Sequence, residues 1–258
     1  MRASAPQAVT RDAELFRDAA DRFAVAAAWA HPRAPVVACP GWTAYDLVVH
    51  LGNVHAWAAT ILETGRPAAE QNDEPRSSRG KVVSAWYAGK AEDLYQVLRQ
   101  VDAEQPCWNF ARGEGTAGFW SRRQLHETTM HRVDLDLACG RPASVDAAVA
   151  VDGVSEVLDV LVHRMHARGL DPALEQPLVL RATDTGATWV VRPSGGVPAV
   201  ERRDPGDVRD RLEAPAEVLY RLLWHREPAE VAASGGAGVR VSGDAERVLA
   251  YLGSRLTP

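Results

Sequence analysis

Apolar residues in the first two-thirds of the chain recur every three or four positions, which is the spacing of an α-helix with one buried face. The pattern predicts five helices, and the polar, proline-containing stretch 66–80 is predicted to be a loop. Thr10 and Thr43 are suited to cap the first two helices, and Gly140 is suited to stop the fourth. The predicted helical ranges are 11–30, 44–65, 81–101, 118–138 and 146–167.

The pattern changes after Asp171 and Pro172, where short β-rich runs replace the helical stripes. Segments 177–182 and 188–192 are predicted to be paired strands that are joined by a turn at 184–186. Further strands are predicted near 197–203, 207–212 and 239–241, and further helices at 215–224 and 245–256. The predicted fold class is therefore α plus α/β: an all-α domain over residues 1–169 and a smaller α/β domain over residues 170–258.

The composition is that of an ordinary globular protein, with 46% hydrophobic and 24% charged residues among 258. The formal net charge of -5 gives no general attraction to nucleic acid or to an anionic membrane. The N-terminus does not resemble a signal peptide, and the most apolar stretch, 23–30, is too short to cross a bilayer. These features predict a cytoplasmic protein that has neither nucleic-acid nor membrane partners.

The chain has three cysteines, Cys39, Cys107 and Cys139, which are widely spaced and form no CxxC pair. An odd number at this spacing argues against a disulfide scaffold and against a zinc site made of thiolates. We expect three reduced thiols with structural roles. Cys107 falls in a predicted loop and is the one to test for reactivity.

The predicted helix 118–138 carries the densest group of chemically active side chains, in the run 126–134. Glu127 and His131 are four residues apart, so their side chains project from one face of the helix. His126 and His131 are five apart, about 140° around the axis at ~100° per residue, so the run differs from the HExxH zinc motif. One carboxylate and one imidazole are therefore available to a metal, which needs a third ligand from another segment.

The predicted helix 44–65 offers His50, which lies near the apolar stripe, whereas His55 points elsewhere. Two packed helices can direct such side chains onto one ion, and three protein ligands leave positions open for a substrate. Spacing alone also allows alternatives that involve no metal. Glu–His pairs four residues apart are mostly surface ion pairs, and a histidine near a core is usually just hydrogen-bonded.

Segments 39–51 and 126–134, with 140–142 and 151–154, resemble the signatures of the mycothiol-dependent maleylpyruvate isomerase family. Segments 183–189, 222–226 and 241–244 resemble the C-terminal domain of that family. The resemblance implies an N-terminal DinB-like up-down four-helix bundle, a smaller C-terminal α/β domain, and His50, Glu127 and His131 as metal ligands. The chain departs from the family at Val133, where many members carry tryptophan.

The resemblance further implies two cofactors: a divalent metal, with Zn²⁺ first and Fe²⁺ or Ni²⁺ as alternatives, and mycothiol, the small thiol of actinobacteria. A metal held by two neutral imidazoles and one carboxylate keeps a positive charge at its open position, which favours a thiolate over a thiol. The thiolate can add to an activated double bond or displace a leaving group on a small electrophile. The predicted activity is therefore that of a mycothiol-dependent cis-trans isomerase or thiol S-transferase, acting as a monomer or weak dimer.

Three further residues are candidates for roles around the metal. Asp46 and Asp134 are placed to orient a ligand imidazole, although Asp46 equally suits the first turn of its helix as a carboxylate favoured by the helix dipole. Arg132 is a candidate contact for the thiol or an anionic substrate, with a surface salt bridge as the alternative. The tryptophans at 42, 57, 86, 108 and 120 are predicted to be core residues.

Two other functions are compatible with the same ligands. An open metal position also suits a hydrolase that uses bound water in place of a thiol. A bundle that keeps its metal as a fold element or a sensor would need no catalysis at all. A thiol titration of the metal-loaded protein separates the thiol-dependent enzyme from the hydrolase. For the non-catalytic protein, the deciding outcome is that His50→Ala retains fold and partner binding and loses no reaction.

Overall fold

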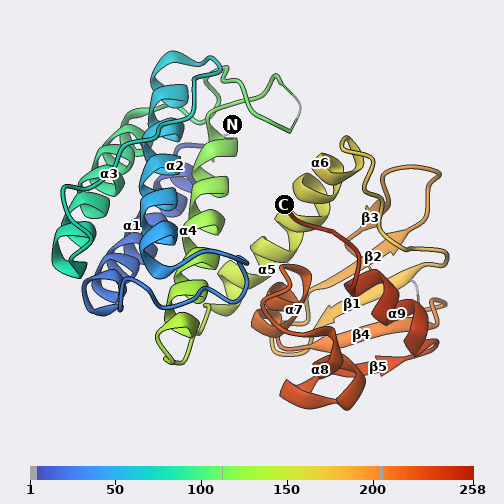
Figure 1. The fold of residues 1–258 in the computed structure, drawn as a ribbon. Coiled ribbons are helices and arrows are strands. Elements are labelled where there is room, and N and C mark those ends of the chain that lie inside the picture. Colours follow the sequence, from blue (N-terminus) through green and yellow to red (C-terminus); the bar gives the residue numbers. More distant parts are fainter. Residues whose placement is uncertain (1–4, 112, 204–205) are drawn as a thin grey trace. The chain divides into compact units, whose positions relative to one another are not determined.

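The computed structural model describes residues 5–111, 113–203 and 206–258 (Figure 1). Contacts within the chain divide it into two compact units, Met1–Ala143 and Ser144–Pro258. The first unit is helical and the second contains a mixed sheet with helices. This confirms the predicted fold class of a helical bundle followed by a smaller α/β domain.

Four long helices build the first unit: α1 (Ala5–Trp29), α2 (Ala44–Thr64), α3 (Gly80–Gln100) and α4 (Gly118–Ala138). Helices α1 and α2 each pack against both α3 and α4, as Figure 1 shows in blue and green. Helix α1 begins at Ala5, so Thr10 lies within the helix and is not its N-cap; Pro6 is tolerated in a first turn. The other three helices match their predicted ranges closely. Large side chains that are fully buried fill the core between them, among them Phe16, Phe23, Leu47, Leu51, Tyr87, Leu94 and Trp120.

Helix α2 has well-defined ends. Its N-terminus forms a capping box, in which the Thr43 hydroxyl accepts the backbone N–H of Asp46 and the Asp46 carboxylate accepts the backbone N–H of Thr43. At the other end Gly65 adopts a left-handed conformation, with φ of 68°, and its N–H donates to the carbonyl of Ile61. These caps define where α2 begins and ends, and they therefore fix the position of His50 along the helix.

Helix α4 is unusual because it is buried on most sides although many of its residues are polar. A helix in this position is normally hydrophobic all round, since buried polar groups cost free energy unless they find partners. In α4 the buried polar and charged side chains lie beside apolar ones such as Leu125, Met130 and Val133. Those polar residues are Ser121, Arg123, Gln124, His126, Thr128, Thr129, His131, Arg132 and Asp134.

The second unit begins with a helical segment in three parts: α5 (Ala147–Glu156), a π-helical turn at Val157–Leu161, and α6 (Val162–His166). Helix α5 packs against α7 (Ala216–Leu223). Gly153 permits this approach, because a Cβ there would lie 2.4 Å from the ring of Tyr220. The indole N–H of Trp189 also donates to the Ser155 hydroxyl at 2.9 Å.

The predicted domain boundary near residue 170 differs from the division that the contacts give, which falls between Ala143 and Ser144. Helical periodicity assigned segment 146–167 to the bundle. Its tertiary contacts with α7 and with the sheet assign it to the C-terminal unit instead. Periodicity identifies a helix but does not say which core covers its apolar face.

The sheet has the strand order β3-β2-β1-β4-β5. Its strands are β1 (Leu178–Ala182), β2 (Thr188–Arg192), β3 (Ala199–Glu201), β4 (Asp210–Ala214) and β5 (Arg240–Ser242). Strands β1 and β4 are parallel, with Leu180 opposite Leu212, and the other pairs are antiparallel. Helices α7, α8 (Ala229–Ser234) and α9 (Ala245–Leu252) complete the unit, with a 3-10 turn at Gly236–Gly238 between α8 and β5. The predicted strand regions and the hairpin turn are confirmed.

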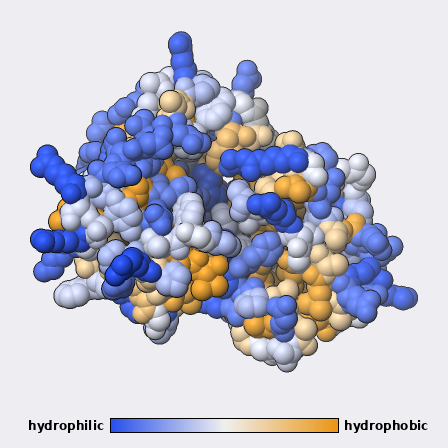
Figure 2. Space-filling model, in the orientation of Figure 1, coloured by the Kyte–Doolittle hydropathy of each residue, from blue (hydrophilic) through white to orange (hydrophobic). Residues whose placement is uncertain are grey.

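The visible face of the molecule in Figure 2 is largely hydrophilic, with smaller hydrophobic areas between the hydrophilic side chains. Within the described residues, none of the helices combines the length and the hydrophobicity that a membrane span requires.

Candidate metal centre

Three side chains converge inside the helical unit at the positions that the sequence predicted. Glu127 and His131 lie one turn apart on α4, with 3.3 Å between Glu127 Oε1 and His131 Nε2. His50 comes from α2 and places its Nε2 3.8 Å from the same oxygen. The ring centroids of His50 and His131 are 5.4 Å apart, with the planes at 87°.

The spacing of these ligand atoms is compatible with one divalent cation. Three such atoms, one each from His50, Glu127 and His131, lie within 4.8 Å of one another. Zinc bonds to nitrogen and oxygen measure ~2.0–2.1 Å, so two ligands of a tetrahedral ion stand about 3.4 Å apart. The two distances to Glu127 Oε1 bracket that value. The donor set of two imidazoles and one carboxylate also fits Zn²⁺ or Fe²⁺.

The three side chains become more exposed from one end of the site to the other. His131 is 11% exposed, Glu127 20% and His50 37%. The three side chains are therefore most accessible to solvent at His50. A structural metal site, in contrast, is closed on all sides by protein ligands.

Asp134 fixes the orientation of His131. Its carboxylate is fully buried, and Oδ2 accepts a hydrogen bond from His131 Nδ1 at 2.9 Å. A carboxylate is an obligate acceptor when ionised, so Nδ1 carries the proton and Nε2 is turned toward Glu127. The hydrogen bond places Asp134 where it can orient a ligand imidazole, and that role toward a metal stays a prediction.

The pKa values of His131 and Glu127 show how strongly the neighbouring charged groups act on these two side chains. Burial lowers the pKa of His131, but hydrogen bonds to Asp134 and Glu127 outweigh it and raise that pKa to about 9. Burial raises the pKa of Glu127, yet the Arg123 charge and hydrogen bonds to the two histidines hold it well below its usual range. A metal that binds here must therefore displace a proton from His131.

Arg123 is a site residue that the sequence analysis did not single out. Its Nη2 donates to Glu127 Oε2 at 2.7 Å, and its side chain is only 4% exposed. The two residues are four apart on α4, as Glu127 and His131 are. That spacing was the available signal, but it is shared by many surface ion pairs.

The turn that leads into α2 adds two more side chains. Trp42 packs against His50, with ring centroids 4.7 Å apart, and is half-buried beside the site instead of lying in the core. Cys39 places its thiol 3.9 Å from Asp134 Oδ2. Cys39, His131 and Asp134 form a second group with metal-ligand atoms close together, on the other side of the His131 ring.

Asp46 does not take the orienting role that its spacing from His50 allowed. Its Oδ2 accepts hydrogen bonds from the backbone N–H and the hydroxyl of Thr43, at 2.8 and 2.7 Å. The carboxylate thus turns back to the helix N-terminus, where the unpaired backbone donors and the helix dipole favour it. The structure supports the alternative in which Asp46 serves the helix end.

Arg132 lies next to His131 but is mostly buried and ion-paired. Its Nη1 donates to Asp136 Oδ2 at 2.9 Å, and Arg141 donates to the other oxygen of Asp136 at 3.2 Å. This supports the ion-pair alternative for Arg132. Contact of its guanidinium with a thiol or substrate stays a prediction.

The two remaining histidines near the site are buried outside it. His55 lies between Gln124 and Tyr87, at 2.9 and 3.2 Å, and His126 is fully buried on α4. Neither belongs to the groups of potential metal ligands found among the described residues. The structure thus places both histidines apart from the three converging side chains, and their exclusion from a metal site stays a prediction.

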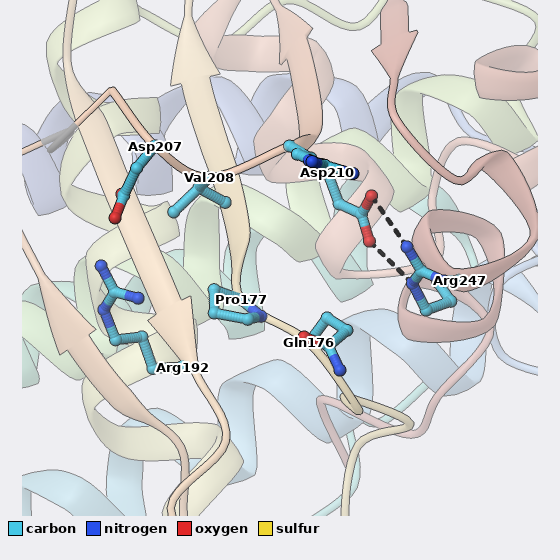
Figure 3. A pocket seen from close by; sticks show the side chains of 8 residues that line it. Gln176, Pro177, Arg192, Asp207, Val208, Asp210 and Arg247 are labelled. Atoms are coloured by element: carbon cyan, nitrogen blue, oxygen red, sulfur yellow. Dashed lines mark hydrogen bonds and ion pairs between the residues drawn. The ribbon is translucent and has the colours of Figure 1, made fainter.

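A cavity of about 430 Å³ lies in the C-terminal unit, at the end of the sheet where β1 and β4 begin and β2 ends (Figure 3). Its buried carboxylate, Asp210, is held by two guanidinium nitrogens of Arg247 at 2.8 and 3.2 Å. Arg192, on the opposite side in Figure 3, pairs with Glu201 at 2.7 Å. These charges satisfy one another, whereas the three side chains in the bundle leave ligand atoms facing a common point.

Two solved structures share this fold. One is the crystal structure of the mycothiol-dependent maleylpyruvate isomerase, and the other is a histidine-to-alanine variant of it. The TM-scores are 0.58 and 0.57, the sequence identity is 12% in both, and each alignment covers 83% of this chain and 88% of the other. Among curated protein sequences none matches significantly.

The family model of the mycothiol maleylpyruvate isomerase N-terminal domain matches residues 2–136 of this chain. The match covers more than half of the sequence, and it includes the three converging side chains and Asp134. The chain therefore belongs to the mycothiol maleylpyruvate isomerase family.

Proposed function

We propose that this protein is a mycothiol-dependent metalloenzyme in which His50, Glu127 and His131 hold one divalent cation. The observation that carries the proposal is the approach of two imidazole nitrogens to one carboxylate oxygen, at 3.3 and 3.8 Å, within the family's own domain. The cation is Zn²⁺ in the first instance, with Fe²⁺ or Ni²⁺ as alternatives. When bound, it supplies a positive charge at an open position, where a thiol loses its proton more readily.

Side chains beside the three proposed ligands hold those ligands in place for the metal. Asp134 holds the proton of His131 on Nδ1, which keeps Nε2 free as a ligand atom. Trp42 packs against the ring of His50, the most exposed of the three ligands, and restricts its rotation. The graded exposure toward His50 gives a thiol and a small substrate access from one side.

The reaction that fits best is cis-trans isomerisation of a small unsaturated acid of the maleylpyruvate type. A thiolate adds to one carbon of the activated double bond, and the adjacent carbonyl accepts the electron pair as an enolate. Rotation about the new single bond and expulsion of the thiolate then give the trans alkene, with no net oxidation. An S-transferase would share the addition and omit the expulsion. We favour isomerisation because the family to which the chain belongs is named for it.

Cobalt-substituted protein provides a direct test, because thiolate binding to Co²⁺ produces an intense near-ultraviolet absorption band. We expect this band when mycothiol is added to the wild-type protein, and its absence in His50→Ala. Mycothiol-dependent conversion of maleylpyruvate to its trans isomer, followed by NMR, then identifies the reaction. A stable thioether product in the same experiment would indicate an S-transferase.

Two outcomes would contradict the proposal. Metal-dependent hydrolysis of test esters without any spectral response to mycothiol would indicate a hydrolase. A protein that retains its metal but shows neither thiol binding nor turnover would indicate a structural or sensory metal.

A further inference from the structure

The two oxygens of the Glu127 carboxylate have different partners. Oε1 faces the imidazole nitrogens of His131 and His50, at 3.3 and 3.8 Å. Oε2 accepts a hydrogen bond from Arg123 Nη2 at 2.7 Å. One oxygen is therefore directed toward the metal position and the other is held by a guanidinium.

Arg123 is built into the interior of the bundle. Its side chain is 4% exposed, less than any of the three predicted ligands. A guanidinium stays charged at every relevant pH, and burying it costs free energy unless a carboxylate pairs with it. An arginine that serves only the surface would be placed in solvent, as Arg22 and Asp18 are in a pair on α1.

Arg123, Glu127 and His131 follow one another at intervals of four along one face of α4. Asp134 continues the row three residues later and accepts from His131 at 2.9 Å. Every member of the row is hydrogen-bonded or within ion-pair distance of the next. The two outer residues, Arg123 and Asp134, thus each contact a predicted ligand from the side away from the metal position.

We propose that Arg123 is a positioning residue that holds Glu127 as a one-oxygen ligand and offsets its charge. This inference rests on the proposed metal centre. Because Oε2 accepts a hydrogen bond from the guanidinium, the carboxylate would bind a cation through Oε1 alone, which would leave a position for the thiol. Because the charges of Arg123 and Glu127 sum to zero, a cation bound here would keep more of its positive charge for stabilising a thiolate.

Removal of Arg123 should therefore change the coordination of the metal as well as the stability of the helix. In Arg123→Met we expect Glu127 to bind through both oxygens. X-ray absorption of the zinc-loaded protein should then show about one additional oxygen ligand. In Co²⁺-substituted protein the visible absorption should weaken, as it does when four-coordinate cobalt becomes five-coordinate.

The pH at which mycothiol binds as a thiolate gives a second measurement. We expect the midpoint of the thiolate-to-cobalt band to shift upward by about one pH unit in Arg123→Met, which corresponds to roughly tenfold weaker thiolate binding. Arg123→Lys retains the charge, but its shorter side chain is expected not to reach Glu127 Oε2 as Arg123 Nη2 does. It should restore most of the midpoint and not the coordination number.

The chain offers a matched control on the same helix. Arg132 and Asp136 form a second i,i+4 pair on α4, at 2.9 Å, with side chains 10% and 13% exposed. Arg132→Met should lower the melting temperature of the metal-free protein, as we expect of Arg123→Met, but leave the zinc coordination number of the mycothiol-free protein unchanged. The difference between the two variants isolates the effect on the metal from the effect of losing an ion pair.

The outcomes separate this inference from the proposed function. If wild-type protein binds no Co²⁺ through His50, Glu127 and His131, the proposed function fails and the inference fails with it. If the wild type binds Co²⁺ and mycothiol, and Arg123→Met changes only the melting temperature, the metal centre stands and the positioning role is overturned. Should Arg123→Met not fold, Arg123→Lys decides, because an unchanged coordination number there would also overturn the role.

Discussion

Two buried histidines in the same helical unit have opposite properties. His131 is hydrogen-bonded to the Asp134 carboxylate and faces Glu127, and despite burial its pKa is raised to about 9. His55 on α2 is fully buried between the Gln124 amide, the Tyr87 hydroxyl and the ring of Phe16. Burial lowers the pKa of His55 to about 4, with only a partial counter-effect from Gln124.

The comparison shows what distinguishes a candidate metal ligand from a core histidine whose ring nitrogens both have hydrogen-bond partners. His55 has a polar partner for each ring nitrogen, and all of these partners are neutral. His131 has a carboxylate on each side, and one of the two, Glu127, also faces His50. Burial is common to both histidines, so it is the surrounding negative charge that makes His131 a candidate ligand.

The largest effect is expected when side chains on the metal-facing and the buried faces are removed one at a time. Glu127→Ala and His131→Ala each delete one of three predicted ligands. We expect metal affinity to fall by more than about a hundredfold, because removing only a residue that hydrogen-bonds a ligand can already lower the affinity by that factor. His126→Ala and His55→Ala should retain the metal. Elemental analysis after dialysis, and competition with a chelator, measure the effect. Equal metal loss in all four variants would contradict the assignment by helix face.

The pH dependence of stability tests the other member of the pair. The pKa of His55 is about 4 in the folded protein and about 6.5 in an unfolded chain, so the unfolded state takes up a proton first as the pH falls. The contribution of His55 to the unfolding free energy is therefore complete above pH 6.5. It is lost between pH 6.5 and pH 4, by about 3 kcal/mol.

Urea denaturation of metal-free protein at several pH values measures this loss, with His55→Gln as the reference. The difference between wild type and His55→Gln should rise with pH from 4 to 6.5 and then level off. His131→Gln provides a control of opposite sign. The stabilising contribution of His131 is present below pH 6.5 and is lost as the pH rises toward 9. A difference for His55→Gln that does not vary with pH would show that His55 titrates normally.

The sequence predicted those parts of the site that depend on a single helix. Segment 118–138 was predicted with the bounds that α4 has, and the four-residue spacing of Glu127 and His131 placed them together. The approach of His50 depends on how α2 packs against α4, which no local pattern reports. It came from the resemblance to a family.

The features that the sequence did not predict depend on which residues, near or far along the chain, a side chain contacts in the folded protein. The spacing of Asp46 from His50 suited a contact with the imidazole, but the nearby donors of Thr43 bind the carboxylate instead. Cys39 and Asp134 are 95 residues apart and meet only in the folded bundle. The predicted domain boundary near residue 170 differs from the observed division for the same reason. The residues that segment 147–166 contacts come later in the chain.

A third test neutralises the charge beside His131 and keeps the histidine itself. In Asp134→Asn the side chain keeps its shape but loses the negative charge that makes His131 basic and fixes its tautomer. We expect metal affinity to fall by about 10–100-fold. Asp136→Asn is the matched control, since Asp136 lies two residues further along α4 and pairs with Arg132 and Arg141. Similar losses in both variants would mean that only the net charge of the helix matters.

The smallest expected effect concerns Asp46, the carboxylate that the sequence placed beside His50 and the structure places at the end of α2. Asp46→Ala removes one half of the capping box and should lower the unfolding free energy by about 1 kcal/mol. Asp46→Asn keeps an oxygen acceptor and should lose less. Neither change should alter metal affinity, because the carboxylate faces Thr43 and not an imidazole. A tenfold weaker affinity in Asp46→Ala, at unchanged stability, would instead give Asp46 the same role toward His50 that Asp134 has toward His131.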